Sequence, residues 1–294
     1  MQRMLRDKKM ISFFILPSLI PFVVLVFVPI VMSAIFSFFG GMIGFNFTFV
    51  GFANYAKLFS DGMFWNALRH TMYYFSIVVP LEVIPGLMFA LLIFFFAGRL
   101  STITRVLLYI PVVLPSMGVG ELFRKILETT PQNGLLNSLL ILVGLEQWVN
   151  GWLGMTNAVM TIISLIDAWR GIGFYVVIFY SALVSIPASV IESARIDGAG
   201  RFAQTRYILM PLIRPVMLIC LILSVNGALK VFEMPFILTK GGPGSASMVV
   251  PLYMYNTAFA FSEYGYGSVI AMVLLLMCLI ITLALNRFDK KESF

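Results

Sequence analysis

Long apolar runs separated by short polar segments dominate this chain. Six of the runs are long enough to cross a hydrocarbon core of about 30 Å at a helical rise of about 1.5 Å per residue. They predict six membrane-spanning helices, at residues 11–38, 68–97, 104–124, 158–182, 212–236 and 265–286. We therefore expect an all-α, polytopic membrane protein with one membrane domain at residues 11–286, an N-terminal tail at 1–10 and a C-terminal tail at 287–294.

The composition excludes an ordinary soluble domain. The 294 residues are 60% hydrophobic and only 11% charged, whereas soluble domains carry about 25% charged residues. The first apolar run follows a basic segment, as in a secretory signal, but its 28 residues exceed the roughly 7–15 of a signal. The run predicts a retained first span.

Few side chains suit metal binding. Cys220 and Cys278 lie inside apolar runs without metal-ligand spacing, so we expect small core residues and no disulfide. His70 is the sole histidine and lies near the outer end of the second span. The sequence predicts no metal site.

The basic residues are distributed unevenly among the segments outside the spans. Thirteen lysines and arginines lie in the two tails and in the segments after spans two and four, whereas Lys57, Lys125 and Lys240 alone occupy the alternate loops. Cytoplasmic segments carry the excess of Lys and Arg in membrane proteins. We expect both termini and the segment after span four to be cytoplasmic, and the net charge of +7 to reflect this orientation and not a nucleic-acid partner.

The segment after span four is unusually polar for this chain. It reads ESARIDGAGRFAQTRYILMPLIRP from Glu192 to Pro215. Its small residues allow close backbone approach, and Glu192 and Asp197 can accept hydrogen bonds. Pro211 and Pro215 are tolerated near a helix start, so they predict where span five begins. We expect a short helix along the cytoplasmic face of the membrane, within residues 188–211.

The same segment resembles the EAA loop of ATP-binding-cassette (ABC) importer permeases. Glu192-Ser193-Ala194 and Asp197-Gly198-Ala199 match that motif, as do Ile208 and the two prolines, whereas Ser193 and Met210 depart from it. TKGGPGSAS, YMYNTAFAFSEYGYGSVIA, FVGFANYAKLFSDGMFWNAL and LLYIPVVLPSMGVG are similar to the carbohydrate-uptake branch. The resemblance covers most of residues 10–288.

This resemblance implies a coupling helix that docks on a cytosolic ATPase. It also implies a second permease as heterodimer partner, an ABC ATPase dimer, an extracytoplasmic solute-binding protein and a bacterial cytoplasmic (inner) membrane. The chain has no G-x-x-x-x-G-K-[ST] loop, so ATP and Mg would be held by partner chains. We expect no cofactor and no enzymatic activity in this chain. The expected coupling residues are Glu192, Ser193, Ala194, Asp197, Gly198, Ala199, Gly200 and Arg201.

Three opposite charge pairs lie inside or beside the predicted spans at a spacing of three residues. On a helix, such pairs meet on one face, and ionisable groups in lipid are costly and often functional. They either pair locally and extend to the membrane surface, or they rim an outward cavity or contact a partner. The pairs are Glu121 with Arg124, Asp167 with Arg170, and Lys230 with Glu233.

A sugar path would need polar groups beside aromatic faces. Trp169, Tyr175, Tyr180 and Asn226 are candidates, each with packing or interfacial anchoring as the alternative. Glu82 lies between Pro80 and Pro85, and Pro111 and Pro115 interrupt span three, where non-ideal helix is tolerated if protein or water covers it. The outer loops 125–157 and 237–264 are expected to contact the solute-binding protein, with a turn at GGPG.

The sequence thus predicts a permease subunit of an ATP-driven, binding-protein-dependent importer for sugars or oligosaccharides. A stand-alone, proton-coupled secondary carrier is an alternative, in which Glu82 would relay protons. An importer of the same mechanism for another solute, such as glycerol phosphate, is a third.

Overall fold

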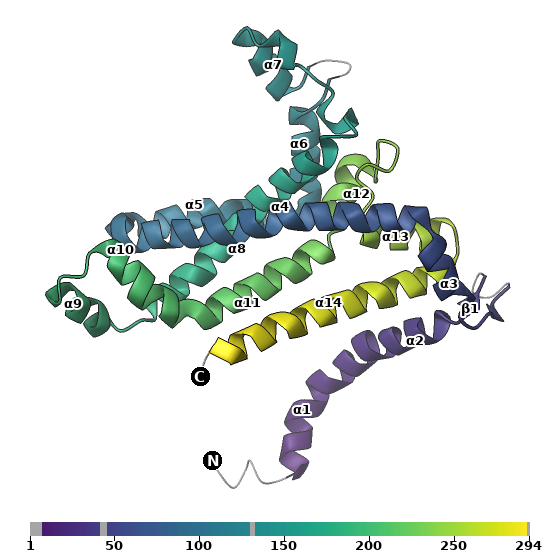
Figure 1. The fold of residues 1–294 in the computed structure, drawn as a ribbon, viewed down its shortest axis with the longest axis horizontal. Coiled ribbons are helices and arrows are strands. Elements are labelled where there is room, and N and C mark those ends of the chain that lie inside the picture. The colour runs from purple at the N-terminus through teal and green to yellow at the C-terminus, as the bar shows by residue number, and fades with distance from the viewer. Residues whose placement is uncertain (1–7, 42–45, 130–132, 293–294) are drawn as a thin grey trace. The chain divides into compact units, whose positions relative to one another are not determined.

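The computed structural model describes residues 8–41, 46–129 and 133–292, and nearly all of them are helical (Figure 1). The strands of this part of the chain form one antiparallel pair, β1 (Phe39–Gly40) with β2 (Thr48–Phe49). The all-α prediction is confirmed. The chain divides into two compact units, of which unit one holds the described residues up to Gly62 and Tyr253–Leu276, and unit two holds Met63–Leu252 and the described residues from Met277.

Unit one contains the first membrane helix, α3, and the segment that leads into the last membrane helix. None of the most apolar residues of the Phe13–Phe36 helix is buried in this chain, so lipid or another subunit must cover them. The helical elements of the unit are α1 (Lys8–Phe22), a π-helical turn (Val23–Phe27), α2 (Val28–Phe36), α3 (Ala53–Ser60), the end of α13 (Val250–Tyr255), a π-helical turn (Asn256–Ala260) and the first part of α14 (Tyr264–Glu292).

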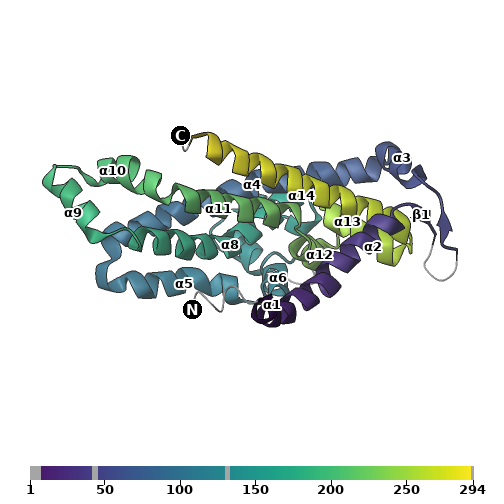
Figure 2. The same ribbon diagram turned by 90° about the horizontal axis from the view of Figure 1, so that it is seen from below.

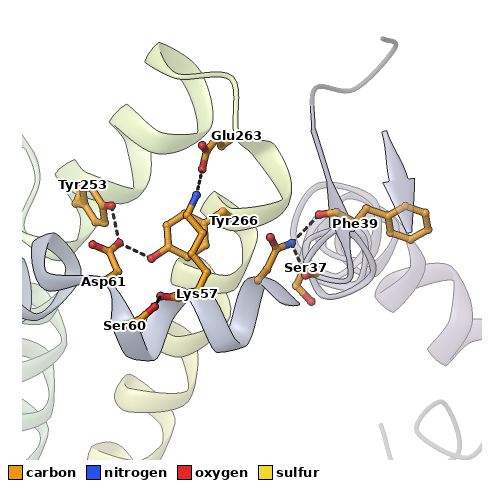
Figure 3. Close-up of polar contacts among 9 residues, drawn as sticks. Ser37, Phe39, Lys57, Ser60, Asp61, Tyr253, Glu263 and Tyr266 are labelled. Atoms are coloured by element: carbon orange, nitrogen blue, oxygen red, sulfur yellow. Dashed lines mark hydrogen bonds and ion pairs between the residues drawn. The ribbon is translucent and has the colours of Figure 1, made fainter. Parts of the chain in front are cut away.

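A polar cluster ties α3 to the segment around α13 and the start of α14 (Figure 3). Asp61 accepts hydrogen bonds from the hydroxyl of Tyr253, at 2.6 Å, and from that of Tyr266. Lys57 Nζ lies 2.5 Å from Glu263 Oε2 and 4.3 Å from the centre of the Tyr266 ring. Burial, and secondly the hydrogen bond to Asp61, raises the pKa of the Tyr253 hydroxyl, which therefore stays protonated and keeps donating.

Unit two is a helical bundle in which α8 lies between α5 and α11 (Figures 1 and 2). Its core includes Phe179 and Leu183 of α8, which pack with Leu209 and Ile213 on the fifth span and Ala90 on α4. The α-helices of the unit are α4 (Gly62–Leu92), α5 (Ser101–Val113), α6 (Ser116–Ile126), α7 (Leu135–Leu142), α8 (Val159–Val184), α9 (Ala188–Ile196), α10 (Arg201–Gln204), α11 (Met210–Leu229) and α12 (Glu233–Thr239), with the start of α13 and the end of α14. Its other helical turns are Ile93–Ala97, Gly98–Leu100, Glu146–Trp148, Trp152–Gly154 and Thr205–Leu209.

Five of the six predicted spans correspond to helical segments. In the described part of the chain these are Phe13–Phe36, Gly62–Phe96, Val159–Val184, Arg201–Thr239 and Tyr264–Arg287, of which Arg201–Thr239 is interrupted at residues 230–232. The third predicted span is a bent pair of helices, interrupted near its prolines, in which α5 and α6 meet at 89°. Leu114 and Pro115, with ψ angles of 135° and 134°, are extended at the bend. Proline lacks an N–H group and moves the residue before it out of the helical region, which explains the break.

The ends of the predicted spans also need correction. The helix of span five begins at Arg201 and not at the predicted residue 212, and it continues through both prolines. Pro211 follows the π-helical turn Thr205–Leu209, and such local π adjustments are one way in which a membrane helix tolerates proline. Helix α1 begins at Lys8, inside the predicted tail of which residues 1–7 lie outside the described chain. Helix α14 continues to Glu292, past the predicted boundary at 286.

Two smaller predictions are confirmed. Cys220 and Cys278 are free and buried. The GGPG segment forms a turn after α12, with φ angles of 89° at Gly241 and 54° at Gly244.

Candidate functional site

Helix α9 gives the polar segment after span four a defined structure. It lies at the end of unit two that is distant from α12 (Figure 1). Gly198 has a φ of +79°, and its N–H donates to Arg195 O at 3.1 Å while the N–H of Ala199 donates to Ala194 O at 2.9 Å. These two bonds form a Schellman motif, which satisfies the last carbonyls of the helix. The predicted short helix is present, and a glycine terminates it.

Most of the predicted coupling residues are exposed on this helix and the turn that follows. Ala199 is half-buried, and Ala194 is only 6% exposed, so the small side chain of Ala194 serves packing within the chain and not an outer contact. Beside them, Ile196 is 86% exposed and Phe202 82% exposed. Exposed apolar residues rimmed by polar ones are typical of interaction surfaces. The exposed predicted residues are Glu192, Ser193, Asp197, Gly198, Gly200 and Arg201.

The turn after α9 is held by a buried glutamine. Gln204 of α10 donates from Nε2 to Ala199 O at 2.7 Å and is 3% exposed. Arg201 places its guanidinium 4.3 Å from the centre of the Phe96 ring, so it also contacts the end of the second span. The turn after α9 is therefore held internally by Gln204 and contacts the rest of the bundle through Arg201.

A cavity of about 560 Å³ opens among the helices of unit two. Its walls come from α4, α8, the end of α5 and the segment that joins α11 to α12. The lining combines charged side chains with aromatic rings. Such a combination suits a polar solute that also packs against flat ring faces. They are Glu82, Asp167, Arg170, Lys230, Glu233, Tyr74, Phe174, Tyr175 and Phe232.

Glu82 projects from α4 to the backbone of α8 and to α11. Its Oε2 accepts a hydrogen bond from Ser224 Oγ at 2.7 Å. A Cβ added at Gly171 would lie 2.1 Å from Glu82 Oε1, so a larger residue at that position would require the carboxyl group to shift. Glu82 thus links three helices while it lines the cavity.

Asp167 and Arg170 form the ion pair that their spacing on α8 predicts. Arg170 Nε lies 3.1 Å from Asp167 Oδ1, and Arg170 Nη1 donates to Ser116 Oγ at 2.7 Å. The hydroxyl of Tyr74 donates to the other oxygen of Asp167. The two side chains are 12% and 25% exposed, so this pair is partly shielded and faces the cavity.

The other two predicted pairs differ from it. Arg124 lies 3.2 Å from Glu121 and also donates to Ile237 O, but both side chains are exposed and neither lines this cavity. Among the described residues, Lys230 and Glu233 form no ion pair, contrary to their expected pairing on a helix. The helix ends at Leu229 and α12 begins at Glu233, so the two side chains do not share a helical face. Both still line the cavity.

Of the predicted solute-path residues, some line the cavity and others do not. Tyr175 and Glu82 line the cavity, whereas Trp169, Tyr180 and Asn226 do not. Trp169 packs edge-on against Phe123, and the ring of Tyr180 lies under Arg105. Asn226 donates to Thr282 Oγ1 at 2.9 Å and so joins α11 to α14. These positions fit the alternative roles of the three residues, which were packing within the chain or anchoring at the interface.

Three polar residues in and around the cavity were missed by the sequence analysis. Tyr74 and Ser116 complete the surroundings of the ion pair, and Ser224 holds Glu82. Each is a polar residue inside an apolar run, which is the one signal that could have identified it. A hydroxyl buried in such a run needs a partner, but the sequence does not say which one.

Replacing Arg170 by methionine should destabilise the protein. Asp167 would keep its shielded charge without the guanidinium. Breaking a fully buried pair costs roughly 3–5 kcal/mol, and this partly exposed pair should cost about 2 kcal/mol. The measurement is the thermal unfolding midpoint of the purified protein, with the double variant Asp167→Asn and Arg170→Met beside it.

Lys125→Met is the matched control for this prediction. Lys125 and Glu128 have the same spacing at 3.0 Å, but their side chains are 64% and 30% exposed. Their loss should change stability by roughly 1 kcal/mol or less. A double variant at residues 167 and 170 that is as unstable as Arg170→Met alone would show that the uncompensated carboxylate is not the cause.

Known proteins give this architecture a context. The family model described as binding-protein-dependent transport system inner membrane component matches residues 71–293. The chain is 32% identical over 290 residues to the probable ABC transporter permease protein YurN of Bacillus subtilis, covering 98% of each chain. It is 27% identical to the lactose transport system permease protein LacF of Rhizobium radiobacter, covering 92% of this chain and 90% of that one.

A solved structure shares the fold. The crystal structure of a bacterial ABC transporter involved in the import of the acidic polysaccharide alginate contains a chain that superposes with a TM-score of 0.85 at 21% identity, covering 100% of this chain and 99% of that one. The curated relatives are permease components, which makes this chain a transporter subunit and not an enzyme. With the family match extending over most of its length, the chain belongs to the binding-protein-dependent transport system inner membrane components.

Proposed function

We propose that this chain is a permease subunit of an ATP-driven importer for sugars or oligosaccharides. It pairs with a second permease in a bacterial cytoplasmic (inner) membrane, with both of its termini in the cytoplasm. A cytosolic ATPase dimer drives transport, and an extracytoplasmic binding protein delivers the solute. The Lys and Arg distribution supports the orientation.

The single observation that carries the ATP-driven mechanism is the exposed helix α9. It is closed by Gly198, it has exposed acids at Glu192 and Asp197, and it lies on the predicted cytoplasmic side. Ile196 and Phe202 are exposed beside it, as expected of anchors for a protein partner. A stand-alone carrier needs no such surface. Helix α9 is therefore assigned the role of the coupling helix that an ATPase moves.

The sugar assignment is supported by the relatives and by the cavity. The relative from Rhizobium radiobacter carries lactose in its name. In this chain the cavity places Phe174, Tyr175 and Phe232 near five charged groups, and aromatic faces with polar neighbours suit pyranose rings. Lys230 is its one lysine, and Arg170 is already paired with Asp167. This balance favours a neutral solute over glycerol phosphate.

The test is uptake by the complete transporter in proteoliposomes. Labelled lactose and a maltooligosaccharide series should be taken up only with the binding protein outside and ATP inside, and uptake should persist when a protonophore removes the proton gradient. Uptake without the ATPase chains, or its loss with the protonophore alone, would identify a secondary carrier. Uptake of glycerol phosphate but of no sugar would overturn the substrate class.

A further inference from the structure

A second cavity lies along the outward face of α5. It measures about 470 Å³ and is almost wholly apolar in its lining, which includes Val106, Ile110 and Val113 of α5 and Val177 of α8. Val106, Ile110 and Val113 are 56%, 48% and 69% exposed, so this chain leaves the groove uncovered. The groove is separate from the charged cavity described above, with which it shares no lining residue.

One cation lies at the end of this groove. Arg105 donates from Nε to Ser101 O at 3.2 Å and from Nη2 to Thr102 Oγ1 at 3.3 Å, and its guanidinium carbon is 4.2 Å from the centre of the Tyr180 ring. Among the side chains that the structure describes, no carboxylate forms an ion pair with Arg105. An arginine near a helix end extends to the membrane interface, where its guanidinium can meet a lipid headgroup as well as the ring face.

The length of the groove fits one leaflet of a bilayer. Thr102 and Val113 bound it along α5, and eleven helical rises of 1.5 Å give about 16 Å, which is about half of a hydrocarbon core of about 30 Å. The 89° bend after Val113 ends this face of the helix. A membrane-spanning helix of another subunit would need an apolar face of about twice this length.

We propose that this groove binds one anionic phospholipid of the cytoplasmic leaflet. The phosphate lies against Arg105, and an acyl chain follows Val106, Ile110 and Val113 toward the bend. Basic pockets beside membrane helices on the cytoplasmic side favour anionic headgroups. The Lys and Arg distribution assigns that side to the start of α5. The proposal is independent of which solute the transporter carries.

The experiment is native mass spectrometry of the complete transporter complex. Phosphatidylglycerol and phosphatidylcholine with identical acyl chains are titrated into the purified complex, and bound lipid is counted. Phosphatidylglycerol should bind more tightly, and Arg105→Gln should weaken its binding about fivefold while binding of phosphatidylcholine changes little. Arg206→Gln is the matched control, because Arg206 is an exposed arginine outside the groove on the same predicted side.

A second variant tests the acyl chain. Ile110→Trp fills the apolar part of the groove and leaves Arg105 in place, so binding of both lipids at this site should fall. The proposal is overturned if the complex binds the two lipids equally, or if Arg105→Gln has no larger effect than Arg206→Gln. It is also overturned if the photoreactive residue benzoylphenylalanine in place of Val106 cross-links to the second permease and not to lipid, since another subunit would then cover the groove.

Discussion

Gly198→Val should abolish most of the uptake by the complete transporter. Gly198 has a φ of +79°, which valine adopts only with strain. The strain opposes the two hydrogen bonds that end α9, from Gly198 N to Arg195 O and from Ala199 N to Ala194 O. A cost of about 1.4 kcal/mol reduces the equilibrium constant for the correctly formed end of α9 tenfold. We expect uptake to fall by about tenfold or more, together with the amount of ATPase that co-purifies.

Two further substitutions separate backbone strain from side-chain size. Neither glycine of this turn has any atom within 4 Å of an added Cβ, but Gly200 has an ordinary φ of −66°. Gly200→Val should therefore leave the hydrogen-bonded end of α9 formed, so that any loss of uptake there reports side-chain bulk on the docking surface and not backbone strain. Gly198→Asn should restore much of the uptake, because asparagine tolerates a positive φ. If Gly198→Asn is as defective as Gly198→Val, the bulk of the side chain and not the backbone conformation is responsible.

Gly173→Ala should destabilise unit two although alanine is the better helix former. A Cβ at residue 173 would lie 2.0 Å from the backbone oxygen of Leu108 and 3.0 Å from Tyr109 Cα. Backbone atoms of α5 cannot move aside as a flexible side chain could, so α5 must separate from α8. Overpacking of this kind costs roughly 1–3 kcal/mol. The expected result is a lower thermal unfolding midpoint of the purified protein.

Gly227→Ala is the control for this substitution. Gly227 also lies within a membrane helix, α11, and nothing lies within 4 Å of an added Cβ. Alanine there should leave stability unchanged or raise it by up to about 1 kcal/mol through helix propensity. Equal stability of Gly173→Ala and the unmodified protein would contradict the close approach of α5 and α8.

Local chemistry made the spans and the coupling segment predictable. Runs of apolar residues specify membrane helices because every backbone group must be satisfied inside lipid. The glycine at residue 198 specifies a helix end because few other residues adopt a positive φ. Pro115 likewise indicated an interruption of the third span, because proline lacks an N–H group, but it did not indicate the angle of the bend. The angle depends on how α6 packs against α12, which brings together segments more than a hundred residues apart.

The cavity was only partly predictable, because it depends on such distant contacts. Asp167 and Arg170 pair at a fixed helical spacing, and the sequence predicts that correctly. Lys230 and Glu233 have the same spacing, yet α11 ends before Lys230 and α12 begins only at Glu233. Tyr74 meets Asp167 across 93 residues, and Ser224 meets Glu82 across 142. No pattern within one segment of the sequence predicts a contact between residues so far apart.

The bend between α5 and α6 has a consequence for the surrounding bilayer. Helix α5 has 13 residues and therefore spans only about 20 Å of a hydrocarbon core of about 30 Å. Along this face the protein has a hydrophobic mismatch, which a membrane relieves by local thinning or by admitting polar groups beyond the helix end. The acyl chain length of the surrounding lipids should therefore affect the packing of α5, which lies directly against α8.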